Sequence, residues 1–154
     1  MADFMQAVQL TLKNEGGFVN NPADPGGATN MGVEQRDLPD TPIQSLTVAQ
    51  ATAYYLETYW KPIYSSITSQ PVASKLFDLG VLFGIGTAVK NLQTALDVEA
   101  DGNFGPATLA AVNQAAPTLL TTFQFEMAAH AKALAAGNPK LSQFLVGWLR
   151  RINS

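Results

Sequence analysis

From residue 14 to residue 33 the chain reads Asn14-Glu15-Gly16-Gly17-Phe18-Val19-Asn20-Asn21-Pro22-Ala23-Asp24-Pro25-Gly26-Gly27-Ala28-Thr29-Asn30-Met31-Gly32-Val33. Before this stretch, apolar residues recur at helical spacing from Phe4 to Leu12, and Asp3 is a suitable N-cap. The pair Gly16-Gly17 ends this predicted helix directly after Glu15. Glycines and prolines then interrupt every regular pattern as far as Leu46. A loop of about thirty residues is rare in a compact domain unless it is functional, so we expect the chemistry to lie here.

Beyond this loop the sequence predicts helices and little else. Thr47 and Gln50 match a capping box, Pro71 and Pro106 suit first helical turns, and Gly84 and Gly137 are expected to end helices. The predicted helices cover about residues 47–60, 71–83, 89–96, 106–115, 117–135 and 141–152. We therefore expect a mainly α protein with one long loop near the N-terminus.

Composition excludes several classes of protein. The chain has 154 residues, of which 47% are hydrophobic and 14% charged, and its net charge is −3. That balance provides no positive field for nucleic acid, so we expect no nucleic-acid partner. No apolar run approaches the ~20 residues of a membrane helix, so we expect no integral membrane segment. Because cysteine is absent and His130 is the single histidine, we predict no metal site and no cofactor.

Glu15 breaks a local rule of helix chemistry. The C-terminus of a helix carries partial negative charge, which disfavours a carboxylate and favours the neutral acid that can donate a proton. Asp24 lies nine residues further on, followed by Thr29 and Asn30 with small polar side chains. An acid, a second carboxylate and such donors are the groups that a glycoside hydrolase uses. Taken singly, Glu15 could be an ordinary solvated residue and Asp24 an ordinary turn former.

The run from Asn14 to Val33 resembles the opening motif of glycoside hydrolase family 108, whose members are lysozyme-like N-acetylmuramidases of phage endolysins and bacterial genomes. This resemblance implies a mainly α, lysozyme-like fold with a small β-hairpin or loop near residues 18–33, in which Glu15 is the catalytic acid. It also implies that Asp24 and Thr29 face the same cleft, where Asp24 would stabilise positive charge or orient water and Thr29 would position water. We expect Asn30 to bind substrate.

The second half of the chain is similar to the predicted peptidoglycan-binding region that accompanies this catalytic domain. The similarity lies in the segments Leu92–Leu109 and Phe144–Arg151. We therefore expect a lysozyme-like catalytic region over residues 1–90 and a helical peptidoglycan-binding-like region over 91–154, packed as one compact unit. The implied partner is bacterial peptidoglycan, and we expect a monomer.

Together these features predict a peptidoglycan hydrolase (lysozyme or N-acetylmuramidase) that cleaves the β-1,4 bond between N-acetylmuramic acid and N-acetylglucosamine. The alternative is a non-catalytic peptidoglycan-binding or secretion-accessory protein with the same fold. Leu82 favours this alternative, because family members tend to have a polar Asn near that position. The first residues lack a basic segment typical of secretory signals. We expect cytoplasmic synthesis without a signal peptide, and action on the cell wall after release or holin-type export.

Overall fold

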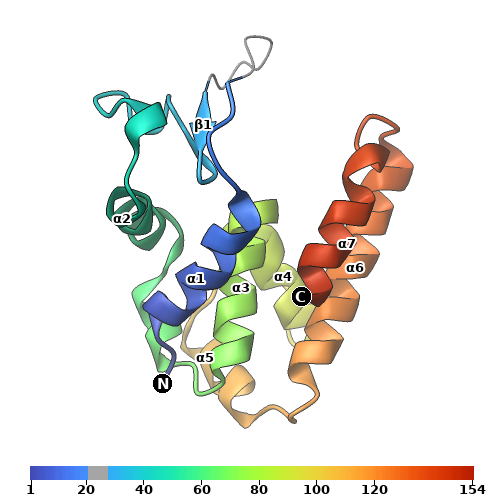
Figure 1. Ribbon diagram of the computed structural model, residues 1–154. Coiled ribbons are helices and arrows are strands. Elements are labelled where there is room, and N and C mark those ends of the chain that lie inside the picture. The colour runs from blue at the N-terminus through green and yellow to red at the C-terminus, as the bar shows by residue number, and fades with distance from the viewer. Residues whose placement is uncertain (21–27) are drawn as a thin grey trace.

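The computed structural model describes residues 1–20 and 28–154. Within them the chain forms α1 (Phe4–Glu15), a hairpin of β1 (Thr29–Asn30) and β2 (Val33–Glu34), α2 (Val48–Tyr59), α3 (Gln70–Phe83), α4 (Ile85–Ala95), α5 (Pro106–Gln114), α6 (Leu119–Gly137) and α7 (Leu145–Asn153). Short 3-10 turns occur at Ile43–Ser45, Pro62–Ser66 and Ser142–Phe144. The mainly α architecture with a small hairpin is the fold class predicted from the sequence (Figure 1).

The helix boundaries follow from local chemistry. Asp3 accepts a hydrogen bond from the backbone nitrogen of Gln6 at 3.0 Å and so caps α1. Thr47 and Gln50 form the predicted capping box at the start of α2. Gly84, with φ +90°, turns the chain between α3 and α4. The sequence placed the next helix near residue 89, but α4 begins at Ile85, because one left-handed glycine suffices for the bend.

Helix α3 is the centre of the molecule. It packs against α1 and α4, while α6 packs on α4 and lies antiparallel to α7 (Figure 1). Phe77 of α3 contacts Phe4, Tyr55 and Trp60 edge to face, with ring centroids 5.6–6.2 Å apart. Trp60 is buried in this aromatic core, as expected for a packing residue. The core therefore joins the N-terminal helix to the centre of the chain.

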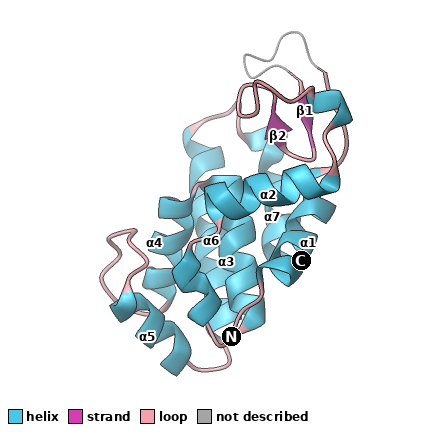
Figure 2. Ribbon diagram, turned by 90° about the vertical axis from the view of Figure 1, so that its left-hand side faces the viewer, coloured by secondary structure: helices cyan, strands magenta, loops and turns pink. Residues whose placement is uncertain are grey.

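The hairpin lies at one end of the molecule and α5 at the other (Figure 2). Residues 29 and 30 pair antiparallel with 34 and 33, and Val19 forms an additional bridge with Thr29. Figure 1 shows that α1 ends beneath this hairpin, so Glu15, its last residue, lies between the helices and the hairpin. Across residues 1–20 and 28–154, no helix combines the length and hydropathy needed to cross a membrane.

Candidate active site

Glu15 is the last residue of α1. Gly16 follows with φ +71°, a backbone conformation that L side chains rarely adopt, so the helix ends at the residue that the sequence indicated. The side chain of Glu15 is 18% exposed. The carboxyl group is thus held within the fold and still open to a ligand.

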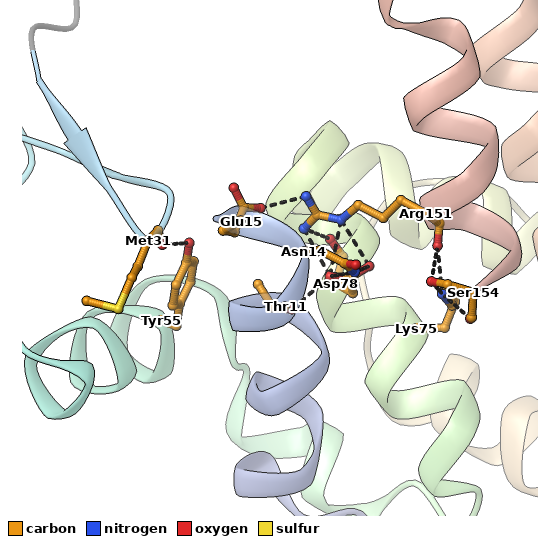
Figure 3. Close-up of polar contacts among 9 residues, drawn as sticks. All are labelled: Thr11, Asn14, Glu15, Met31, Tyr55, Lys75, Asp78, Arg151 and Ser154. Atoms are coloured by element: carbon orange, nitrogen blue, oxygen red, sulfur yellow. Dashed lines mark hydrogen bonds and ion pairs between the residues drawn. The ribbon is translucent and has the colours of Figure 1, made fainter. Parts of the chain in front are cut away.

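Arg151 of α7 forms the main polar contact of Glu15 (Figure 3). Its Nη1 lies 2.6 Å from Oε1 of Glu15. The same guanidinium makes a two-pronged contact with Asp78 of α3, with Nε 3.1 Å from Oδ2 and Nη2 2.9 Å from Oδ1. Asp78 is fully buried and also accepts a hydrogen bond from Thr11 Oγ1 of α1 at 2.9 Å. This network ties together helices α1, α3 and α7.

The charges in the network balance one another. The C-terminus of α1 opposes the negative charge of Glu15, and Arg151 compensates for it. Burial by itself lowers the pKa of Arg151, but the hydrogen bonds and charges of Asp78 and Glu15 outweigh burial and raise it. Nearby, Lys75 Nζ donates to the carbonyl oxygens of Arg151 and Ser154, both at 2.9 Å. Burial lowers the pKa of Lys75.

The tip of the hairpin closes the other side of Glu15. Met31 and Gly32 connect the two strands with φ +49° and +75°, the signs of a type I′ turn. The buried Tyr55 of α2 donates its hydroxyl hydrogen to the carbonyl oxygen of Met31 at 2.8 Å. Burial, followed by the negative charge of Glu15, raises the pKa of Tyr55, so its hydroxyl remains a donor.

Gly32 approaches the carboxyl group more closely than any other amino acid could. A Cβ atom at this position would lie 2.5 Å from Oε2 of Glu15 and would overlap the Tyr55 hydroxyl. The backbone of the turn therefore rests directly against the carboxyl group. Oε1 of Glu15 faces Arg151, while Oε2 faces the hairpin.

The other predicted site residues have different surroundings. Thr29 is half-buried on β1, opposite Glu34. Glu34 forms an ion pair with Arg36 at 2.5 Å without the alignment of a hydrogen bond. Asn30 is buried, and its Nδ2 donates to the carbonyl oxygen of Ile43 at 3.0 Å, which anchors the hairpin. Asp24 lies outside the described residues. Its predicted role, and those of Thr29 and Asn30, stay predictions.

Sequence reasoning missed the partners of Glu15. Neither Arg151 nor Tyr55 was predicted from the sequence to lie beside the Glu15 carboxyl group. One signal was present: Asp78 is an isolated acid between Phe77 and Leu79 in an apolar helix. A buried carboxylate needs a cationic partner, but the sequence does not say which cation supplies it.

The residues around Glu15 can support proton transfer. One carboxyl oxygen is paired with a cation, the other faces a backbone turn, and the side chain is accessible to a ligand. Within residues 1–20 and 28–154, no group of three or more His, Cys, Asp or Glu side chains could hold a metal ion.

Comparisons with known proteins match both halves of the chain. The family model for glycosyl hydrolase 108 matches residues 8–84, and that for a predicted peptidoglycan domain matches residues 87–153. Among solved structures, the chain is similar to SagA of Brucella abortus, with 32% identity and a TM-score of 0.79. The match covers 97% of this chain and 89% of that chain. No curated protein shows significant similarity.

Proposed function

Because the chain belongs to the glycosyl hydrolase 108 family and has a lysozyme-like fold, we propose that it is an N-acetylmuramidase with Glu15 as its general acid. The family and the second matched region support a peptidoglycan hydrolase-like function. The proposed reaction is hydrolysis of the β-1,4 bond between N-acetylmuramic acid and N-acetylglucosamine. The observation that carries this proposal is Glu15 at the end of α1, accessible and held between Arg151 and the hairpin turn.

In the proposed reaction, Glu15 protonates the glycosidic oxygen while the bond from that oxygen to the anomeric carbon breaks. Water then supplies a hydroxyl group to the anomeric carbon, and the proton that it releases restores the acid form of Glu15 through the solvent. Asp24 would stabilise the positive charge on the sugar or orient the water, and Thr29 would position it. Because Arg151 engages Oε1, we propose that Oε2, which faces the hairpin, carries the proton.

The two matched regions would act as one unit in this proposal. Arg151 lies in the second region, while its two acidic partners lie in the first. A guanidinium that bridges them fixes the direction of the Glu15 side chain, and general acid catalysis depends on such positioning. The second region would therefore contribute to the geometry of the site as well as to wall binding.

Glu15→Gln tests the proposal. Glutamine keeps the size of the side chain but cannot donate an acidic proton, and general acid–base catalysis typically contributes about 10²–10⁴-fold. We expect the rate of wall clearing per folded molecule to fall by about that factor. Glu57→Gln, an exposed change on α2, is the matched control and is expected to clear walls normally. Near-native clearing by Glu15→Gln would remove Glu15 from the reaction.

Product analysis tests the bond that is cleaved. Mass spectrometry of digested walls should find muramic acid at the reducing ends. Glucosamine at the reducing ends would instead indicate cleavage of the other glycosidic bond. Either product would establish a glycoside hydrolase, but only the first agrees with a muramidase.

The alternative, a non-catalytic wall-binding or accessory protein, is favoured by two observations. The resemblance implies a polar Asn near the position that Leu82 occupies, and the Glu15–Arg151 pair keeps the proposed acid in contact with a cation. A protein of this kind would sediment with purified walls without clearing them. Turbidity and sedimentation measured on the same walls separate the two functions.

A further inference from the structure

A groove lies beside the network of Glu15, Arg151 and Asp78. Its volume is about 590 Å³, with α1 on one side, the turn Ser142–Phe144 and α7 on the other, and Leu82 at the end of α3. Arg151, which contacts Glu15, also lines this groove. Only the side chain of Arg151 would therefore separate a ligand that contacts this residue from the proposed acid.

The groove is positively charged although the protein is acidic overall. Lys13 of α1 and Arg150 of α7 line it, both are exposed, and neither forms an ion pair with any residue in 1–20 or 28–154. Among the described residues that line the groove there is no Asp or Glu, while the chain as a whole has a net charge of −3. Two cations without partners, one on each wall, favour a ligand that carries carboxylates.

The groove also offers apolar surface. Phe144 and Trp148 stack at a centroid distance of 6.1 Å, and Phe144 is 49% exposed. Leu82 adds an aliphatic side chain to this surface. Gly147 has open space where a side chain would be, which leaves the groove accessible from this side. Apolar patches between cations fit a chain with small apolar groups and acidic ends.

We propose that this groove binds the carboxylate-bearing peptide arm of a peptidoglycan strand whose sugars lie at Glu15. Lys13 and Arg150 would pair with the carboxylates, and Leu82, Phe144 and Trp148 would contact the methyl groups. The proposal rests on the proposed function, since it extends that substrate from the glycan to its peptide. It assigns Leu82 to a peptide-binding surface, so this residue need not indicate a loss of activity.

Direct binding of a free stem peptide provides the first test. A tetrapeptide of alanine, glutamate, lysine and alanine in cell-wall linkage carries the required carboxylates and is not a glycosidase substrate. Trp148 lines the groove, while Trp60 is buried in the core, so quenching of tryptophan fluorescence reports on the groove. We expect quenching that weakens at least fivefold when the peptide carboxylates are amidated.

Two double variants test the cations. Lys13→Gln/Arg150→Gln should weaken peptide binding at least fivefold. Lys132→Gln/Lys140→Gln removes the same charge from exposed positions outside the groove and should change binding less than twofold. Circular dichroism of each variant checks that folding is retained. Equal binding by both variants, equal affinity for the amidated peptide, or no quenching at millimolar peptide would overturn the proposal. Stronger quenching by uncharged chitooligosaccharides than by the peptide would assign the groove to the glycan instead.

Hydrolysis assays separate failure of this proposal from failure of the proposed function. Intact walls carry peptide arms, whereas amidase-treated glycan strands do not. We expect Lys13→Gln/Arg150→Gln to lose at least fivefold more activity on intact walls than on stripped strands. If the unmodified protein cleaves neither substrate, the muramidase proposal fails while peptide binding is still measurable. If it cleaves both and the two double variants behave alike, the groove proposal fails.

Discussion

Replacing Arg151 with methionine should destabilise the protein strongly. Arg151→Met keeps most of the aliphatic length but leaves Asp78 as a fully buried carboxylate without its ion-pair partner. Its remaining partners are Thr11 at 2.9 Å and the weaker contacts of Asn14 at 3.4–3.5 Å. Removing one partner of a buried ion pair costs about 3–5 kcal/mol. For a domain of this length, that loss lowers Tm by roughly 6–20 °C.

Arg150→Met is the matched control. It removes the same charge from the neighbouring position, but Arg150 is exposed and forms no ion pair with a described residue. Such surface changes usually stay within about 0.5 kcal/mol. Urea denaturation followed by far-ultraviolet circular dichroism at pH 7 gives the free energy of unfolding for each variant.

A second substitution shows whether the unpaired charge causes the loss. Asp78→Asn removes the charge but keeps an oxygen that can accept the hydrogen bond from Thr11. Added to Arg151→Met, it should therefore restore about 2 kcal/mol, because the two residues are in direct contact and their effects are not additive. The reasoning is refuted if Arg151→Met lowers the free energy of unfolding no more than Arg150→Met does. It is also refuted if adding Asp78→Asn to Arg151→Met lowers that free energy further.

Gly32→Ala should cut the rate of wall clearing at least tenfold and lower Tm. The new Cβ would overlap the Glu15 carboxyl and Tyr55 hydroxyl groups, and alanine is strained at a φ of +75°. Gly17→Ala is the control and should change neither the rate nor Tm, because a Cβ at that position has open space around it. Burial raises the pKa of Tyr64 to about 12. The folded state therefore binds more protons than the unfolded state between about pH 10 and 12, and stability is lost as the pH rises through this range. Tyr64→Phe should reduce this alkaline loss by about 1.4 kcal/mol when urea titrations at pH 8 and pH 11 are compared. Asp24→Asn should slow clearing per folded molecule less than Glu15→Gln does; a lower Tm with unchanged turnover would show that Asp24 is structural.

Local signals predicted most of the fold. Caps and helix-breaking residues act on the backbone within a few residues of themselves. Asp3, Thr47 and Gly84 therefore indicated helix boundaries without any knowledge of the tertiary structure. The errors occurred where packing extends a helix beyond such a signal. Helix α4 includes Gly86, and its buried Ala88, Val89 and Leu92 stabilise the turn around that glycine.

The candidate site could be predicted only in part. Glu15 was found because its position breaks a rule within its own helix. Arg151 was not, because pairing a cation with a particular acid depends on how α7 packs against α1 and α3, and no spacing along the chain encodes that contact. Gly32 lay within the resembling motif, but the reason that only glycine fits there is a contact with Tyr55 and Glu15 in space.

The contact between Glu15 and Arg151 also has a consequence in time. Ribosomes synthesise protein from the N-terminus at about 5–20 residues per second, so Arg151 is added roughly 7–27 s after Glu15. During that interval α1 and the hairpin can form, but the carboxyl group has no cation to orient it. A nascent chain would therefore carry an unassembled site until nearly all of these residues had been made.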